Sequence, residues 1–304
     1  MISVVIPTRN EAANVEKIAA AVIAQMETTG EPFDLIFIDN ASADETVALV
    51  RAMCASDPRI RLIVNARNFG QMRSPTHAIY QAAGDAVIAM CADFQDPPAL
   101  LPRFVERWRT GGPIILGVRQ SEAGSVGLGL GRRFSYWFAR RFADYPVIPD
   151  ATGFGLYDRR VVETLKAIDE PEPFFRGMLV ESGFKIETIP YPRPERAAGK
   201  SNNGFFALLD FALSGLAGSS KKLLRAPLYL GAGMAVLTGV ALIVALLTRS
   251  WLWLGVAAVE AHFALLFLVL GLIADQVRLT TERTRKTPLV IEAERVNFPA
   301  GYGA

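Results

Sequence analysis

Three oxygen-bearing side chains follow one short apolar run of this sequence. Residues 86–91 have the composition of a buried strand, and Asp93, Gln95 and Asp96 come directly after them. Carboxylate and amide oxygens this close together are the ligands that Mg²⁺ and Mn²⁺ prefer in proteins, usually together with oxygens of a substrate phosphate. The stretch therefore predicts a divalent metal site that would neutralise a diphosphate group. The simpler alternative, which the stretch by itself leaves open, is a capped turn before the two prolines that follow.

The first 120 residues alternate between strand-like runs and segments with apolar residues at helical spacing. Strands are expected at Ile2–Ile6, Leu35–Ile38, Ile60–Val64, Ala86–Cys91 and Ile114–Gly117. This alternation predicts an α/β fold, an open and mostly parallel sheet with helices on both faces. The loops after the first four strands would meet at the carboxyl edge, where such sheets bind ligands. The pair Ser74-Pro75 predicts a helix that begins there, because proline suits a first helical turn.

The composition excludes several classes of protein. The chain of 304 residues carries 32 Lys and Arg against 30 Asp and Glu, a net charge of +2, so no nucleic-acid partner is expected. The two cysteines, Cys54 and Cys91, have no metal-ligand spacing, which argues against a disulfide framework or a thiolate zinc site. The first residues run into a strand-like segment and not a signal peptide, so the N-terminal part is expected to stay where it is made.

Two long apolar stretches lie late in the chain. Residues 226–247 carry no charge, and residues 250–274 carry one, Glu260. Because about 20 apolar residues span a bilayer, the two stretches predict a transmembrane hairpin. Basic residues on both flanks predict cytoplasmic termini and thus an integral protein of the inner or plasma membrane. The alternative is two long buried helices of a soluble protein.

These segments predict four parts. They are a cytoplasmic catalytic domain over 1–202, an amphipathic interfacial helix over 203–225, the transmembrane hairpin over 226–274, and a cytoplasmic tail over 275–304. Within the tail, Leu289–Ile291 is the only apolar run and predicts a docking strand. Glycines of the first apolar stretch would permit close helix packing, so a homo-oligomer is expected.

Several motifs occur in the order typical of one enzyme family. Ile2–Glu11 resembles the opening of inverting family 2 glycosyltransferases, and Ile38–Thr46 resembles their Asp-Asp-Gly-Ser-x-Asp-x-Thr segment. Asn68–Gln71 and Ala92–Pro98 are similar to the branch that glycosylates polyprenyl phosphates, which includes dolichol-phosphate mannosyltransferase and the bactoprenol glucosyltransferases; Thr152–Asp158 is a further match. The resemblance implies a GT-A-like fold, a UDP- or GDP-linked sugar donor, an undecaprenyl or dolichyl phosphate acceptor, and Mg²⁺ or Mn²⁺.

The resemblance also implies roles for individual residues. The nucleotide pocket would be lined by Pro7, Thr8, Asn10, Glu11, Asp39, Asn68, Gly70 and Asp93, with Asp39 at the base edge. Asp93 and Gln95 would hold the metal on the diphosphate, with Asp96 beside them as a catalytic residue. Asp150 stands where the family has its proposed base. Because a phosphate monoester has its second pKa near about 6, the acceptor is already nucleophilic and Asp150 would orient it more than deprotonate it.

The acceptor phosphate needs cations, because two anions must approach each other. The candidates are Arg119, Arg196 and Lys200, with Ser201 in the loop that resembles the acceptor side of the family. For Arg119, simple solvation at the surface is an open alternative.

The sequence departs from the family pattern in two places. Gly153 and Gly155 replace a second acid and an arginine, and Asn40 and Ala41 replace the usual Asp-Gly. These departures keep open a second hypothesis, a catalytically silent scaffold that binds nucleotide sugar. A third hypothesis, a processive polysaccharide synthase, would require a Gln-x-x-Arg-Trp element, but the pair Arg107-Trp108 lacks the glutamine.

Overall fold

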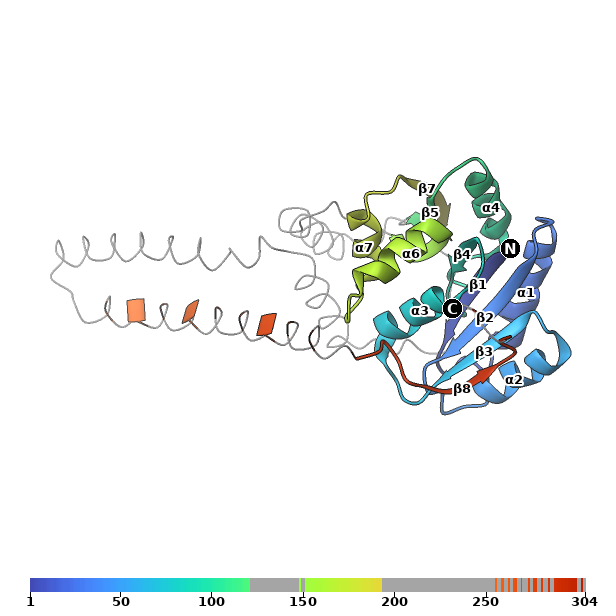
Figure 1. Ribbon diagram of the computed structural model, residues 1–304, viewed down its shortest axis with the longest axis horizontal. Coiled ribbons are helices and arrows are strands. Elements are labelled where there is room, and N and C mark those ends of the chain that lie inside the picture. The colour runs from blue at the N-terminus through green and yellow to red at the C-terminus, as the bar shows by residue number, and fades with distance from the viewer. Residues whose placement is uncertain are drawn as a thin grey trace.

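The computed structural model describes residues 1–120, 148, 151–192, 287–299 and 302, with scattered positions between 255 and 284. Its strands form one eight-stranded sheet in the order β7-β5-β6-β4-β1-β2-β3-β8 (Figure 1). The strands are β1 Ile2–Thr8, β2 Phe33–Asp39, β3 Ile60–Asn65, β4 Ala86–Ala89, β5 Ile114–Gln120, β6 Ala151–Asp158, β7 Ile186–Pro192 and β8 Glu292–Val296.

The centre of the sheet is parallel. β1 pairs in parallel with β2 and β4, and β2 pairs in parallel with β3. β6 is antiparallel to both β4 and β5, and β7 runs parallel to β5. The chain therefore adds strands on one side of β1 up to β3 and then returns to its other side with β4. Ligands of open α/β sheets bind at such a switch point, outside the carboxyl ends of the strands.

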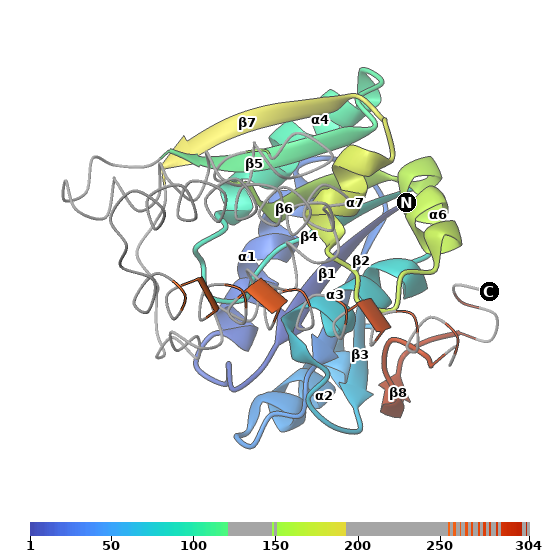
Figure 2. The same ribbon diagram turned by 90° about the vertical axis from the view of Figure 1, so that its left-hand side faces the viewer.

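Helices cover both faces of the sheet (Figures 1 and 2). They are α1 Val15–Glu27, α2 Thr46–Ser56, α3 Gly70–Gln81, α4 Leu101–Arg109, α6 Arg159–Ile168, α7 Phe175–Glu181 and the short 3-10 helix η1 Pro98–Leu100. Alternate side chains of a strand face opposite layers: Val4 packs with α1, α2 and α4, while Val5 packs with α3, α6 and α7. The expected α/β fold with helices on both faces is confirmed.

One predicted helix start is wrong. α3 begins at Gly70, and Pro75 lies inside it, because the turn that precedes the helix is set by other contacts. Asn68 Oδ1 accepts a hydrogen bond from Gly70 N at 2.9 Å, and Gly70 has a φ of 84° that favours glycine. Ser74 does not cap the helix but is fully buried, and its hydroxyl accepts from Asn65 Nδ2 at 2.9 Å.

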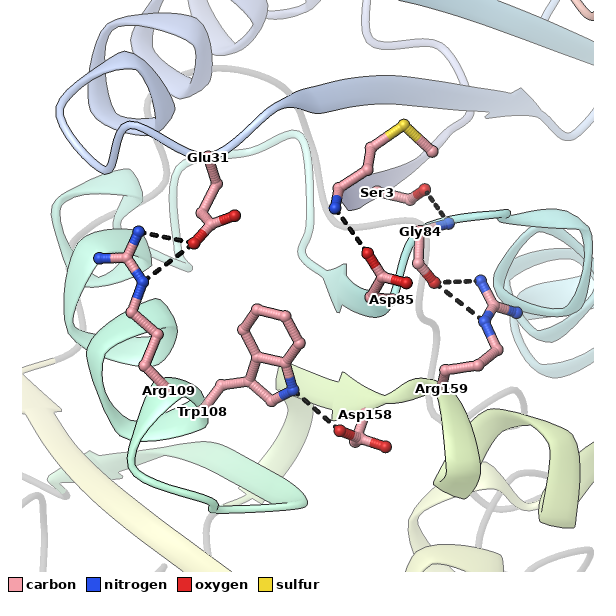
Figure 3. A network of polar contacts seen from close by, with 9 residues as sticks. Ser3, Glu31, Gly84, Asp85, Trp108, Arg109, Asp158 and Arg159 are labelled. Carbon is pink, nitrogen blue, oxygen red and sulfur yellow. Dashed lines mark hydrogen bonds and ion pairs between the residues drawn. The ribbon is translucent and has the colours of Figure 1, made fainter.

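Polar contacts stabilise the edge of the sheet at which β1 and β4 begin, opposite the switch point (Figure 3). The Trp108 indole N–H donates to Asp158 at 2.9 Å, and the Arg159 guanidinium donates to the carbonyl of Gly84. Gly84 N in turn donates to Ser3 Oγ at 3.0 Å, and a Cβ at position 84 would lie 2.6 Å from Ser3 N. This close backbone approach requires glycine and aligns the beginnings of β1 and β4.

The last strand comes from the C-terminal tail. β8 lies antiparallel to β3 beside α2 (Figure 2) and begins one residue after the run expected to dock, 289–291. Arg51 of α2 makes a two-pronged ion pair with Glu294, with a shortest contact of 2.6 Å. Asn297 donates to the carbonyl oxygens of Cys54 and Ile60 at 2.6 and 2.9 Å. The tail therefore completes the sheet of the N-terminal domain.

The structure corrects the expected membrane architecture. Among the residues that it describes, no helix is both long and apolar enough to cross a membrane. α1 has 13 residues, the most of any helix with described bounds, which gives about 20 Å against the roughly 30 Å of a hydrocarbon core. The predicted transmembrane hairpin, and with it the predicted integral membrane protein, is therefore not supported by the described residues. Residues 203–225 and 226–247, and most of 250–274, lie outside the described part of the chain.

Candidate active site

The loops after β1 and β2 are tied together at the carboxyl edge of the sheet. Asn10 N donates to Ser42 Oγ, and Ala43 N donates to Asn10 Oδ1, both at 2.8 Å. Glu11 N donates to Thr46 Oγ1 at 2.9 Å. Pro7 and Thr8 are the last residues of β1, so the four residues predicted for the nucleotide pocket from this segment lie together.

Asp44 supports the same pair of loops. Its carboxylate accepts from Ala12 N at 3.1 Å and from the N–H and hydroxyl of Thr46, at the first position of α2. Partial burial would raise the pKa of Asp44, but these hydrogen bonds outweigh it and lower the pKa. Sequence reasoning missed Asp44 as a site residue, although its place two residues before the helix start was the available signal.

Asp39 is fully buried at the end of β2. One carboxylate oxygen accepts from Ser42 N at 2.8 Å, and the other accepts from Ser42 Oγ at 2.5 Å and from Thr8 Oγ1 at 3.4 Å. In this structure Asp39 therefore fixes the turn that follows β2.

Two more predicted pocket residues, Asn68 and Gly70, lie where β3 connects to α3, of which Gly70 is the first residue. Both bond to Asn40, which follows β2, through the Asn68 side chain and the Gly70 carbonyl oxygen. The structure thus brings the loops after β1, β2 and β3 to one edge of the sheet. Asn65, the last residue of β3, joins the same contacts and was not singled out from the sequence.

The metal-type loop follows β4, on the other side of β1. β4 ends at Ala89, before the expected Cys91, because the backbone turns there and Cys91 N donates to Asp96 Oδ2 at 3.0 Å. Gln95 N donates to Asp93 Oδ1 at 3.1 Å, which brings the amide-bearing residue and the first carboxylate together. The residue between them, Phe94, has a φ of 62°. Asp93 and Gln95 thus stand at the switch point of the sheet.

Left-handed backbone conformations gather at this edge. Asn10, Ala41 and Phe94 have φ values of 55°, 59° and 62°, and they lie in the loops after β1, β2 and β4 respectively. Such a conformation costs a residue with a Cβ about 1–2 kcal/mol, and strain of this kind concentrates at functional sites. The distribution supports a ligand site here on grounds independent of residue type.

The donor set suits a hard divalent cation. Asp93 and Gln95 offer a carboxylate and an amide oxygen, which match Mg²⁺ or Mn²⁺ bound through few protein ligands plus phosphate oxygens and water. Among the described residues, no three His, Cys, Asp or Glu side chains form a group that could hold a metal ion alone.

Asp96 belongs to a different set of contacts. It is 1% exposed, and its Oδ1 accepts from the Tyr191 hydroxyl at 3.0 Å and from Arg119 at 3.2 Å. Burial, followed by the charge of Asp96, raises the pKa of Tyr191. For Arg119, burial is outweighed by Tyr191 and Asp96, so the pKa is raised. Arg119 therefore stays cationic, with its charge balanced inside the protein by Asp96, and surface solvation is not its environment.

The segment that carries the expected base is described only in part. Asp150 lies outside the described residues, as do Arg196, Lys200 and Ser201. β6 begins at the next residue, Ala151, whose carbonyl oxygen accepts from Arg176 at 2.7 Å. Sequence reasoning did not single out this arginine of α7.

The glycine that replaces the family arginine has a packing reason. A Cβ at position 155 would lie 2.4 Å from the carbonyl oxygen of Ile115 on β5, so no side chain fits there. The second departure, Gly153, has a φ of 93°, a conformation that favours glycine.

Arg107-Trp108, the pair considered for a processive synthase, lies at the end of α4. Its indole bonds to Asp158 in the network at the opposite edge of the sheet (Figure 3). This position separates the pair from the loops after β1 and β4.

The fold and this edge define a class, the α/β enzymes that bind ligands at the carboxyl ends of an open, doubly wound sheet. Within that class the chain belongs to glycosyl transferase family 2, whose profile matches residues 3–165. The family resemblance predicted from the motifs is confirmed. The expectation that the chain is a glycosyltransferase is confirmed by this family membership.

Individual relatives agree with the assignment. The chain is 28% identical over 300 residues to the uncharacterized glycosyltransferase YkcC of Bacillus subtilis, covering 95% of this chain and 92% of that protein. It is 31% identical over 233 residues to the bactoprenol glucosyl transferase of Shigella phage SfV, covering 76% of this chain and 75% of that protein. The similarity to the latter supports the expected branch of the family.

A solved structure shares the fold. Glucosyl-3-phosphoglycerate synthase from Mycobacterium tuberculosis, in complex with Mn²⁺, uridine diphosphate and phosphoglyceric acid, matches with a TM-score of 0.50 and 18% identity. The match covers 71% of this chain and 76% of that one. It supports the GT-A-like α/β fold.

Proposed function

We propose that the protein is an inverting glycosyltransferase that moves a sugar from a UDP- or GDP-linked donor to a polyprenyl phosphate, such as undecaprenyl or dolichyl phosphate. The observation that carries the proposal is the position of Asp93 and Gln95 at the switch point of the sheet, in the loop after β4, the strand next to β1. The acceptor class is proposed because relatives of 31% identity are named bactoprenol glucosyl transferases.

The donor nucleotide would lie across the loops after β1, β2 and β3. Pro7, Thr8, Asn10 and Glu11 would form one wall, with Asp39 below them, and Asn68 and Gly70 would form the other wall. Asp93 would face the diphosphate. Hydrogen bonds already hold these loops in place, so little ordering would be required when the nucleotide binds.

Asp93 and Gln95 would hold Mg²⁺ or Mn²⁺. When bound, such an ion supplies positive charge that stabilises a departing nucleoside diphosphate. Asp96 would hold the loop after β4 in its conformation, because it accepts hydrogen bonds from Cys91 N and from the Tyr191 hydroxyl. Its negative charge would also act on the reacting groups next to the metal.

The acceptor phosphate would attack the anomeric carbon from the side opposite the diphosphate, so the configuration would invert. Asp150 would orient the phosphate, which is largely dianionic at neutral pH because its second pKa is about 6. Arg196, Lys200 and Ser201 would supply cationic and hydrogen-bonding contacts to it. Because Asp96 balances the charge of Arg119, we assign Arg119 a smaller share of this attraction than the two other cations.

The test is transfer of radiolabelled sugar from each common nucleotide sugar into polyprenyl phosphate solubilised in detergent, with Mg²⁺ or Mn²⁺ present. The full chain should transfer label from at least one donor and give product of inverted configuration. Metal-dependent nucleotide binding with no transfer across several acceptors would favour the silent scaffold. Long polymeric product would favour a processive synthase. A homo-oligomer remains a prediction, to be measured by light scattering on the same sample.

A further inference from the structure

The side chain of Asn40 uses its full hydrogen-bonding capacity. Its Oδ1 accepts from Phe69 N at 2.8 Å and from Asn65 Nδ2 at 3.2 Å. Its Nδ2 donates to Asn68 Oδ1 at 2.8 Å and to the Gly70 carbonyl oxygen at 3.0 Å. An amide has two lone pairs and two N–H groups, so all four are engaged.

The partners fix the orientation of this amide. Phe69 N can only donate and the Gly70 carbonyl oxygen can only accept, so a rotated amide would lose both contacts. Asn40 is 8% exposed, which makes an unmatched polar atom costly there. An asparagine in this orientation is therefore required by its neighbours and not merely tolerated.

Three of these four contacts hold the turn between β3 and α3. Asn40 follows β2, the strand next to β3, and bonds to the three consecutive residues 68–70. Asn68 Oδ1 also accepts from Gly70 N at 2.9 Å. Asn65 extends the set to α3, because its Nδ2 also donates to Ser74 Oγ at 2.9 Å. The position of the turn thus depends on a side chain that comes from the end of β2.

We propose that Asn40 is a positioning residue that sets the turn 68–70 for the donor nucleotide, and that this chain requires the amide where its family commonly has an acid. The inference rests on the proposed function, because it takes the turn to be a wall of the nucleotide pocket. A carboxylate at position 40 would keep the contacts with Phe69 N and Asn65. It would set negative charge against Asn68 Oδ1 and the Gly70 carbonyl oxygen, and the turn would move away from β2.

The experiment compares the full chain with its Asn40→Asp variant in the presence of Mn²⁺. Calorimetry gives the Kd of UDP and of GDP, and kinetics with the active donor give KM and kcat. We expect Asn40→Asp to weaken nucleotide binding and to raise the donor KM by about tenfold or more, since two buried hydrogen bonds are lost. The KM of the acceptor should stay close to that of the unmodified chain.

A purely structural role predicts a different result. It would lower the unfolding temperature of Asn40→Asp and leave the donor KM of the folded protein unchanged, which would overturn the inference. Gln25→Glu is the matched control, because it makes the same amide-to-acid change on α1, toward the opposite edge of the sheet. It should leave both nucleotide binding and kinetics unchanged.

Two further outcomes are distinguishable. If the unmodified chain binds neither nucleotide, the proposed function fails and the inference fails with it. If the unmodified chain binds and Asn40→Asp binds equally well, the inference alone is overturned. Should Asn40→Asp not fold, the neutral variant Asn40→Ser is measured instead. Serine is too short to reach Asn68 and Gly70, so the same loss of donor affinity is expected, and an unchanged Kd would contradict the inference.

Discussion

The hydroxyl of Tyr191 donates to the Asp96 carboxylate at 3.0 Å and so joins β7 to the loop that follows β4. The two residues are far apart in the sequence, and both are buried. Arg119 of β5 bonds to both of them, to the tyrosine oxygen at 3.2 Å and to the carboxylate at 3.2 Å. The antiparallel half of the sheet thereby supports the loop that carries Asp93.

Tyr191→Phe tests this support. The change removes the hydroxyl that donates to Asp96 and accepts from Arg119, so two hydrogen bonds with charged groups are lost. The free energy of unfolding is expected to fall by at least about 1.5–3 kcal/mol. It should also lower kcat, because the loop after β4 loses a constraint next to Asp93 and Gln95. Urea unfolding and steady-state kinetics measure the two effects. An unchanged kcat together with lower stability would show that Asp96 and Tyr191 act only in folding.

Asp93→Asn tests the metal site. The variant keeps the shape of the side chain but loses its charge, so transfer activity should fall by about a hundredfold or more, in line with the loss of a group that stabilises a leaving diphosphate. Addition of EDTA to the unmodified chain should abolish activity, and Mn²⁺ or Mg²⁺ should restore it. Asp85→Asn is the control, because Asp85 lies before β4 at the opposite edge (Figure 3). Full activity of Asp93→Asn would remove the metal role.

Ser42→Ala tests the junction of the loops after β1 and β2. The Ser42 hydroxyl donates to Asp39 and accepts from Asn10 N, so alanine leaves a buried carboxylate oxygen and a backbone N–H without this partner. We expect the Kd of the nucleotide to rise by about fivefold to thirtyfold, the equivalent of one lost hydrogen bond or two. Calorimetry with UDP and GDP measures it. A Kd equal to that of the unmodified chain would exclude this junction from the nucleotide pocket.

Ala41→Gly should make the protein more stable. Ala41 has a φ of 59°, which costs a residue with a Cβ about 1–2 kcal/mol, whereas glycine adopts it freely. Glycine also gains entropy in the unfolded chain, so the net increase in the free energy of unfolding should be about 0.5–1 kcal/mol. Urea denaturation measures the change. A decrease would mean that this backbone conformation carries no strain.

Glu292→Gln should change how stability depends on pH. Burial would raise the pKa of Glu292, but hydrogen bonds with His77 and Arg295 outweigh it and lower the pKa to about 2. An unfolded glutamate has a pKa of about 4.3, so its contribution is complete above that pH and is lost as the pH falls toward about 2. The variant should be less stable at neutral pH and should lose less stability during acidification. The matched change Glu294→Gln removes a more exposed ion pair of the same strand and should have a smaller effect. Equal pH profiles for both variants and the unmodified chain would contradict the role of Glu292.

The bounds of the C-terminal strand could not be predicted from the local sequence pattern. The run Leu289–Ile291 predicts a docking strand, and Val290 is indeed buried against the domain. The paired strand, however, is Glu292–Val296, and three of its five residues are charged. The position of this polar edge strand depends on the residues that it pairs with, which are Arg51, His77 and β3. These residues lie more than two hundred positions away in the chain. Neither the pairing nor the ion pairs can be deduced from local composition.

The sequence by itself determined the parallel half of the sheet and the family, and it predicted the edge at which a ligand is expected and the metal-type residues Asp93 and Gln95. These follow from local causes: apolar alternation sets the strands, and a short motif after each strand must lie at its carboxyl end. Only the tertiary structure decided that Asp39 is buried against Ser42, that Asp96 is paired with Arg119 and Tyr191, and that Asn40 holds the turn after β3. Within the described residues it contains no helix long and apolar enough to cross a membrane, so the predicted hairpin is not supported there. The physical reason is that hydrogen bonding and charge pairing depend on which atoms lie about 3 Å apart, and the order of residues along the chain does not set those distances.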